Sequence, residues 1–190
     1  MNTQPISCSC QNLFASIYNA VLRPKQCWED IQSSSRSPFE LLLTIALPLN
    51  IAYLIVSRSA LLSTLSITQI TIGIAITTTL QLTAIVCASW TIQKLAPLFR
   101  GKMSRTDSTY LVVYPMIPIW LSLLVSHLPY GYLFLLGAIA LSLYSLYQGL
   151  VVLGNTPQRS IIQFFSVVVA CAVTTYVIIV SIYALAALFI

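Results

Sequence analysis

A long stretch without a single charged residue constrains this chain more than any other feature of its sequence. Residues 110–153 read YLVVYPMIPIWLSLLVSHLPYGYLFLLGAIALSLYSLYQGLVVL and contain no Asp, Glu, Lys or Arg. A helix needs about 20 mainly apolar residues to cross the hydrocarbon core of a bilayer. The stretch is therefore long enough for two spans, which meet at the uncharged corner 126–131. We expect this hairpin to lie at the centre of the fold, with the other helices packed around it.

The composition extends this interpretation to the whole chain. Apolar residues make up 58% of the sequence and charged residues 7%, whereas a soluble domain carries about 25% charged residues. So few charges cannot cover a surface in water, and lipid must therefore be the solvent. We predict an all-α polytopic membrane protein with five transmembrane helices, preceded by a short interfacial amphipathic helix pair. The predicted units are a cytoplasmic segment, 1–38, and a transmembrane domain, 39–190, with spans at about 39–57, 67–95, 110–126, 130–153 and 161–189.

The N-terminal segment has an apolar face at helical spacing. This face contains Leu13, Phe14, Ile17, Tyr18, Val21 and Leu22. Pro24 can start a second short helix, which carries Trp28 and Ile31 on one side. The apolar face can lie on the membrane surface, where Trp and Tyr favour the headgroup level, or it can pack against the cytoplasmic ends of the spans. Under either alternative, we select four residues as interfacial or partner contacts: Phe14, Tyr18, Trp28 and Ile31.

The basic residues predict the orientation of the chain in the membrane. Eight of them fall on one side of the predicted spans, and only Arg58 falls on the other. By the positive-inside rule, the N-terminus is cytoplasmic and the C-terminus is outside. Anionic lipid headgroups attract such a cluster by about 1 kcal/mol per charge. The predicted lipid contacts are Lys94, Arg100, Lys102 and Arg105. We expect no nucleic-acid partner, because the positive charge sits at helix ends.

Small residues mark the last two spans as a packing pair. One stripe consists of Ala138, Ser142, Ser145 and Gly149, and the other of Ser166, Ala170 and Thr174. Small residues let two helix backbones approach closely in a membrane. We therefore predict that the fourth and fifth spans pack through these two stripes.

Polar residues in the second span allow two interpretations. Thr71, Thr78 and Gln81 fall near one face of this helix, where they can hydrogen-bond a neighbouring helix or line a polar path. The third span contains Pro115 and Pro118, so it is predicted to be bent or broken. A polar path would run between these two spans.

Catalytic and metal-binding motifs are absent from the sequence. The acids are Glu29, Asp30, Glu40 and Asp107, and all lie in flanks or loops rather than at membrane depth. Proton relays and intramembrane acid–base enzymes need a titratable group at depth. Cys8, Cys10 and Cys27 lack a convincing fourth metal ligand. We therefore expect no enzyme activity, no cofactor and no metal.

Three motifs together resemble the Ypt-interacting-protein (Yip) domain family. The first is Leu22-Arg-Pro24-Lys-Gln-Cys-Trp28-Glu-Asp-Ile31, which resembles the P-x-x-x-W-x-x-I entry of that family. The second is Tyr110-x-x-x-Tyr114-Pro115-x-x-Pro118, at the start of the third span. The third is Tyr144-Ser-Leu-Tyr147-Gln-Gly149-Leu150 followed by Thr156-Pro157. Their order and spacing agree with the family along nearly the whole chain.

The resemblance implies a five-span domain with a cytoplasmic N-terminus. Eukaryotic members bind prenylated Rab GTPases and one another, but this chain lacks their D-L-x-G-P motif. We therefore expect a bacterial inner-membrane member. The predicted function is a non-enzymatic scaffold, adaptor or accessory subunit that acts through protein and lipid contacts, with another membrane protein or a second copy as its partner. The alternative is a small channel or permease for a neutral solute or lipid.

Overall fold

The computed structural model describes residues 17, 18, 21, 23–32, 37–59, 66–126, 128, 130–154 and 156–187. In this part of the chain every regular element is a helix. Five helical stretches are long and apolar enough to cross a membrane. The predicted all-α fold class with five membrane spans is therefore confirmed.

The first span, Pro38–Ser59, changes its helical geometry along its length. It begins as α3 (Pro38–Leu41), continues as a π-helical segment (Leu42–Ala46) and ends as α4 (Leu47–Ser59). Pro48 lacks a backbone N–H and would crowd the carbonyl group four residues before it in a regular helix. The wider π-helical turn lies just before this proline, where the Leu47 N–H bonds the Leu42 carbonyl. The first span therefore accommodates Pro48 with a wider turn just before it.

Capping boxes set the start of the next two long helices. Ser66 caps α5 (Ile67–Leu95), and Ser104 caps α6 (Arg105–Leu124), each with reciprocal bonds to the residue three positions on. This cap starts α6 five residues before the predicted span at 110. Pro115 and Pro118 lie inside α6 without interrupting it, so the broken alternative is wrong, and a bend at these prolines stays a prediction.

The last two spans are α7 (Gly131–Leu153) and α8 (Gln158–Ala187). A tight corner joins α6 to α7, as the sequence predicts. Tyr130 adopts a left-handed conformation with φ of 66°, and the Gly131 N–H bonds the Leu128 carbonyl at 2.9 Å. This corner returns the chain along α6, so the two helices form an antiparallel hairpin.

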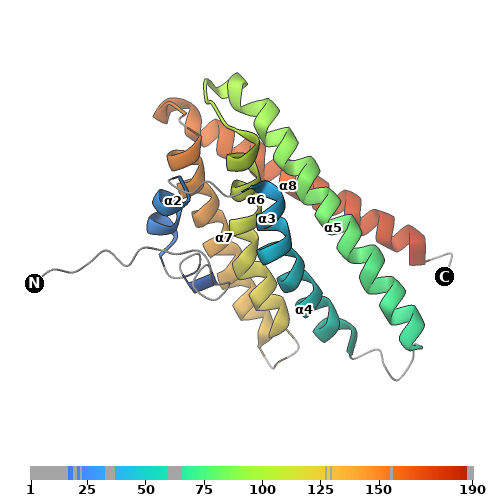
Figure 1. Ribbon diagram of the computed structural model, residues 1–190. Coiled ribbons are helices and arrows are strands. Elements are labelled where there is room, and N and C mark those ends of the chain that lie inside the picture. The colour runs from blue at the N-terminus through green and yellow to red at the C-terminus, as the bar shows by residue number, and fades with distance from the viewer. Residues whose placement is uncertain are drawn as a thin grey trace, which may run out of the picture.

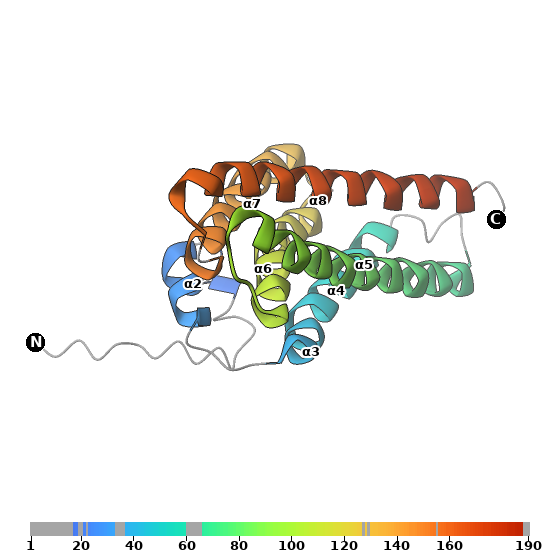
Figure 2. The same ribbon diagram turned by 90° about the horizontal axis from the view of Figure 1, so that it is seen from above.

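Helix α6 forms the centre of the bundle, with α4, α5 and α7 packed around it (Figure 1). Viewed from above, α5 and α8 run in opposite chain directions with their axes roughly aligned, and both extend beyond the other helices (Figure 2). The short helix α2 (Pro24–Gln32) packs on α7. Of the first predicted amphipathic helix, only Ile17, Tyr18 and Val21 are described, and all three are helical.

Candidate functional site

Residues from the three family-like motifs meet at one place in the bundle. Trp28 of α2 is 1% exposed, and its ring centroid lies 5.8 Å from that of Tyr114 in α6. Tyr110 lies one turn earlier in α6, with its ring 5.7 Å from the Tyr114 ring. The first two motifs are therefore joined by an aromatic contact between α2 and α6.

Gly149 of α7 brings the third motif to the same place. A Cβ atom added to Gly149 would lie 2.8 Å from the Trp28 ring and 2.6 Å from Leu111. These distances are too short for carbon atoms, so only glycine gives the Trp28 ring room against α7. Gln32 adds a hydrogen bond from its Nε2 to the Val152 carbonyl at 3.4 Å. We call Trp28, Tyr110, Tyr114, Leu111 and Gly149 the tryptophan lock.

The tryptophan lock changes the interpretation of the predicted partner contacts. Trp28 and Ile31 are 1% and 3% exposed, so the chain's own helices already cover them. Of the two alternatives for this helix, the structure shows packing on the protein, because α2 buries its apolar side against α7. Tyr18 is 55% exposed and remains accessible. Phe14 lies outside the described residues.

Two loops contact each other at the end of the bundle that carries most of the basic residues. The Lys102 N–H bonds the Gly154 carbonyl at 3.2 Å, which joins the α5–α6 loop to the α7–α8 loop. A Cβ atom on Gly101 would lie 2.6 Å from the Thr156 hydroxyl, so the loops touch closely. Phe99 stacks on Phe164 of α8 with ring centroids 5.0 Å apart. The two loops therefore form one platform.

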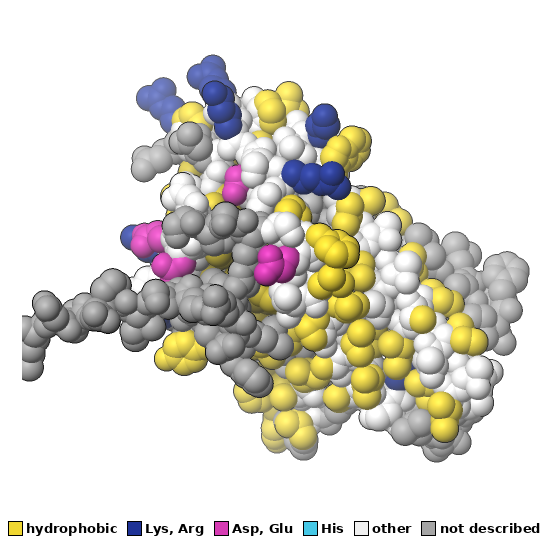
Figure 3. Space-filling view, in the orientation of Figure 1, with side chains coloured by type: hydrophobic (Ala, Val, Ile, Leu, Met, Phe, Trp, Pro, Cys, Tyr) yellow, Lys and Arg dark blue, Asp and Glu magenta, His cyan; other side chains and the backbone are white. Residues whose placement is uncertain are grey.

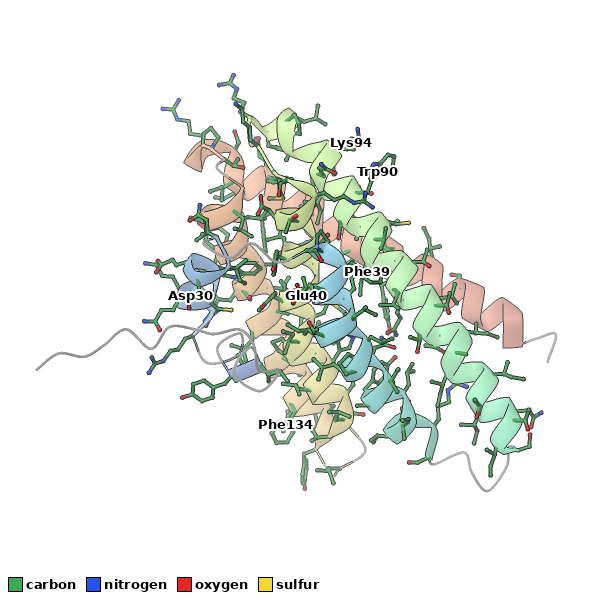
Figure 4. All side chains as sticks on the ribbon, viewed as in Figure 1. Asp30, Phe39, Glu40, Trp90, Lys94 and Phe134 are labelled. Carbon is green, nitrogen blue, oxygen red and sulfur yellow. The ribbon has the colours of Figure 1, made fainter. Side chains whose placement is uncertain are left out.

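The predicted lipid contacts lie on and beside this platform. Lys94, Arg100, Lys102 and Arg105 are all exposed. Dark-blue basic groups gather at this end of the molecule in Figure 3. Lys94 lies 5.9 Å from the ring centre of Trp90, and both project from the same end of α5 (Figure 4). A cation beside an exposed Trp is typical of a residue at a membrane interface.

The two small-residue stripes do not meet. On α7, the stripe Ala138, Ser142, Ser145 and Gly149 is buried. At Gly149 it faces Leu111 and Trp28 rather than α8. On α8, the stripe Ser166, Ala170 and Thr174 is exposed. The predicted contact through both stripes is thus replaced by contacts such as Tyr147 with Phe165, whose rings are 5.9 Å apart.

The residues of the predicted polar path are divided among different surroundings. Thr71 is exposed and bonds the Ile67 carbonyl of its own helix at 2.9 Å. Gln81 donates from Nε2 to the Tyr53 hydroxyl of α4 at 2.8 Å. Thr78 is buried, and its hydroxyl has no hydrogen-bond partner among the described residues. Gln81 therefore hydrogen-bonds a neighbouring helix, as the helix-packing interpretation of these polar residues predicts.

The α6 prolines are buried, and Pro118 lines an apolar groove between α6 and α7. The groove has a volume of about 850 Å³, and Ala138 and Phe134 form part of its α7 wall. Phe134 projects near the α6–α7 corner (Figure 4). Pro118 therefore faces this groove of mostly apolar side chains.

Two polar residues of α4, Asn50 and Arg58, have surroundings that the sequence does not predict. Asn50 is 1% exposed, and neither atom of its amide group has a partner among the described residues. Arg58 lies in the last turn of the first span, and its side chain extends over α5. Asn50 could have been found in the sequence as a single amide side chain within an apolar run. Nothing in the sequence indicates the direction of the Arg58 side chain.

A central membrane hairpin, five apolar spans and charged groups collected at helix ends define a polytopic α-helical integral membrane protein. Residues 18–189 match the family model described as the Yip1 domain. The chain therefore belongs to the Yip1 domain family, as its three motifs predicted. Proteins of this family interact with other proteins and with membranes, and the family is not known for enzymatic activity. Searches of curated proteins and of solved structures found no match.

Proposed function

We propose that this protein is a non-enzymatic membrane scaffold that binds a further transmembrane helix along α8. The observation that carries the proposal is the uncovered stripe Ser166, Ala170 and Thr174. The corresponding stripe on α7 is already covered by its own chain. Of these two stripes, the one on α8 therefore remains open to a partner.

Helix association in lipid depends on close backbone contact, because lipid tails are as apolar as Leu side chains. The α8 stripe suits such contact. Ser166 bonds the Ile162 carbonyl and Thr174 bonds the Ala170 carbonyl, each at 2.9 Å. These hydroxyl groups are satisfied within α8, so a partner helix can cover them without leaving an unpaired polar group.

The basic platform supports the second part of the proposal, which is contact with anionic lipid headgroups. It presents Lys94, Arg100, Lys102 and Arg105 on locked loops at one end of the bundle. We propose that this end and the N-terminus are cytoplasmic, because basic residues favour that side, and that the C-terminus is outside. We further propose a bacterial inner membrane, because residues 1–38 lack the D-L-x-G-P motif of the eukaryotic members.

Ala170→Leu tests the α8 proposal, because the larger side chain prevents close backbone approach. The full chain would be extracted in membrane-derived nanodiscs and studied by native mass spectrometry. We expect the unaltered protein to carry a stoichiometric partner, either a second membrane protein or a second copy, and Ala170→Leu to lose it. Ala140→Leu is the matched control, because Ala140 is exposed on α7.

Equal partner occupancy in Ala170→Leu and Ala140→Leu would remove α8 as the binding surface. A monomer that carries only lipid in every sample would contradict the scaffold proposal. In that case, flux through liposomes would test the channel or permease alternative next.

A further inference from the structure

The Arg58 side chain extends from the last turn of α4 and lies over Gly73 of α5. Its Nη2 lies 3.4 Å from the Thr77 hydroxyl of α5. A Cβ atom on Gly73 would lie 2.5 Å from Nη1 and 3.2 Å from Cζ of Arg58. Gly73 therefore leaves the space that the guanidinium group occupies. The side chain is half-buried between α4 and α5.

No carboxylate side chain neutralises this guanidinium group. The four Asp and Glu residues of the chain belong to α2, α3 and the start of α6. Glu40 and Asp30 lie well away from the start of α5 (Figure 4). A guanidinium group has five N–H donors, and Thr77 is the acceptor that the structure describes for it. Among the described residues this half-buried charge has one neutral acceptor, and a bound anion would add hydrogen bonds to its remaining N–H groups.

The position of Gly73 along α5 indicates where such an anion comes from. Lys94, beside Trp90, marks one membrane interface on this helix. Lys94 follows Gly73 by 21 positions, which span about 32 Å at a rise of about 1.5 Å per residue. This length matches the hydrocarbon core of about 30 Å. Gly73 and Lys94 are therefore far enough apart to lie at opposite boundaries of the hydrocarbon core, and the headgroup phosphates lie just outside each boundary.

Apolar side chains beside this position suit the rest of a lipid molecule. Ile72 and Ile76 neighbour Gly73 and Thr77 on α5, and they are 54% and 46% exposed. An acyl chain can lie along them while the headgroup is at Arg58. Figure 3 shows one small dark-blue patch among apolar side chains at this end, apart from the basic groups of the platform.

We propose that the Arg58 guanidinium group, seated over Gly73 and bonded to Thr77, binds a phosphate oxyanion through its remaining N–H groups, and that the phosphodiester of a phospholipid in the leaflet opposite the basic platform supplies this anion. The planar guanidinium group binds two phosphate oxygens at once. Thr77 accepts a hydrogen bond from the Arg58 side chain, and Gly73 leaves room for its guanidinium group. This site is separate from the α8 surface and does not depend on it.

Native mass spectrometry of the full chain in detergent tests this site, with phosphatidylglycerol as the probe. Diacylglycerol, which lacks the phosphate, and inorganic phosphate are tested in parallel. We expect Arg58→Gln to lose one bound phosphatidylglycerol that the unaltered protein retains. Gly73→Ala keeps the charge but displaces the guanidinium group, and we expect it to weaken binding at this site by about tenfold or more.

Two control variants separate this site from general effects. A Cβ atom on Gly137 of α7 meets no atom within 4 Å, so Gly137→Ala tests a harmless glycine substitution. Arg159→Gln removes an exposed charge at the other end of the bundle. Both should retain the Arg58-dependent lipid. Arg58→Lys keeps the charge without the planar fork and gives an intermediate loss, which provides a readout if Arg58→Gln does not fold.

The outcomes decide between the possible sources of the ligand. Retention of every lipid in folded Arg58→Gln and Gly73→Ala would overturn the site. Equal retention of diacylglycerol would show that acyl chains alone account for binding and would also overturn it. Displacement of phosphatidylglycerol by equimolar inorganic phosphate would identify a free anion as the ligand and overturn the lipid assignment. Phosphatidylglycerol retention that resists inorganic phosphate and requires Arg58 supports the proposal.

Discussion

Helices α6 and α8 are both membrane spans, but other helices cover most of α6 and little of α8. The α6 span is less apolar than the α8 span. Nevertheless, the protein buries 61% of the residues in an 18-residue stretch of the α6 span, compared with 17% in an 18-residue stretch of the α8 span. The more apolar helix is the one left to lipid.

This difference shows what apolar character means in a membrane protein. Hydropathy decides that a helix leaves water, but it does not decide which membrane helix other helices cover, because lipid and protein interiors are equally apolar. Helix α6 is central because its aromatic side chains fit against its neighbours. Tyr110, Tyr114 and Trp120 are each at most 3% exposed. The α8 side chains, by contrast, need no protein partner to be stable in lipid.

Trp28→Ala should have the largest effect on this comparison, because it removes the ring that connects α2 with α6 and α7. Loss of a fully buried Trp costs about 3–5 kcal/mol of unfolding free energy. Titration of the purified protein with SDS in mixed micelles, followed by circular dichroism, measures the change. Trp90→Ala is the matched control, because Trp90 is 60% exposed. Similar stabilities for the two variants would show that the tryptophan lock does not hold the bundle together.

Gly149→Ala probes the same lock from the α7 side. The added methyl group collides with Trp28 and Leu111, and overpacking of this kind costs about 1–3 kcal/mol. The effect should shrink in a Trp28→Ala background, since the Trp28 ring is then absent. Strict additivity of the two substitutions in the same SDS titration would contradict direct contact between Trp28 and Gly149.

A matched pair of valines compares α6 and α8 directly. Val113 of α6 is 0% exposed and Val173 of α8 is 57% exposed. Val113→Ala should lower the unfolding free energy by about 2 kcal/mol, because protein cannot fully fill the cavity. Val173→Ala should change it by less than about 0.5 kcal/mol, because lipid replaces the lost methyl groups. Equal losses in the mixed-micelle titration would mean that α8 is covered by protein in the membrane.

Gln81→Leu should have the smallest effect of these changes. It removes the hydrogen bond from Gln81 to the Tyr53 hydroxyl, which connects α5 to α4. Hydrogen bonds between membrane helices contribute about 0.6 kcal/mol on average. Tyr53→Phe removes the same bond from the other side, so the double variant should be no less stable than either single variant. A loss of several kcal/mol of unfolding free energy would show that this contact contributes as much to stability as the packing around α6.

Much of the local structure could be predicted from residue order alone. Apolar runs predicted five spans, and Pro24 predicted the start of α2. The tight corner between α6 and α7 was also predictable from its sequence. The division into a segment 1–38 and a domain 39–190 stays a prediction, as do the orientation of the chain and the roles of its basic residues.

Residue order alone was enough to predict the apolar spans and several helix ends, such as the start of α2 at Pro24, because hydropathy and backbone chemistry act over a few neighbouring residues. Only the tertiary structure decided which surfaces were already occupied. Trp28 is buried within the helix bundle, and the small-residue stripe of α8 is exposed. The Arg58 side chain packs over Gly73. These outcomes depend on contacts between distant helices. In lipid, an apolar face is equally stable against a helix or a lipid tail, so side-chain shape decides between them.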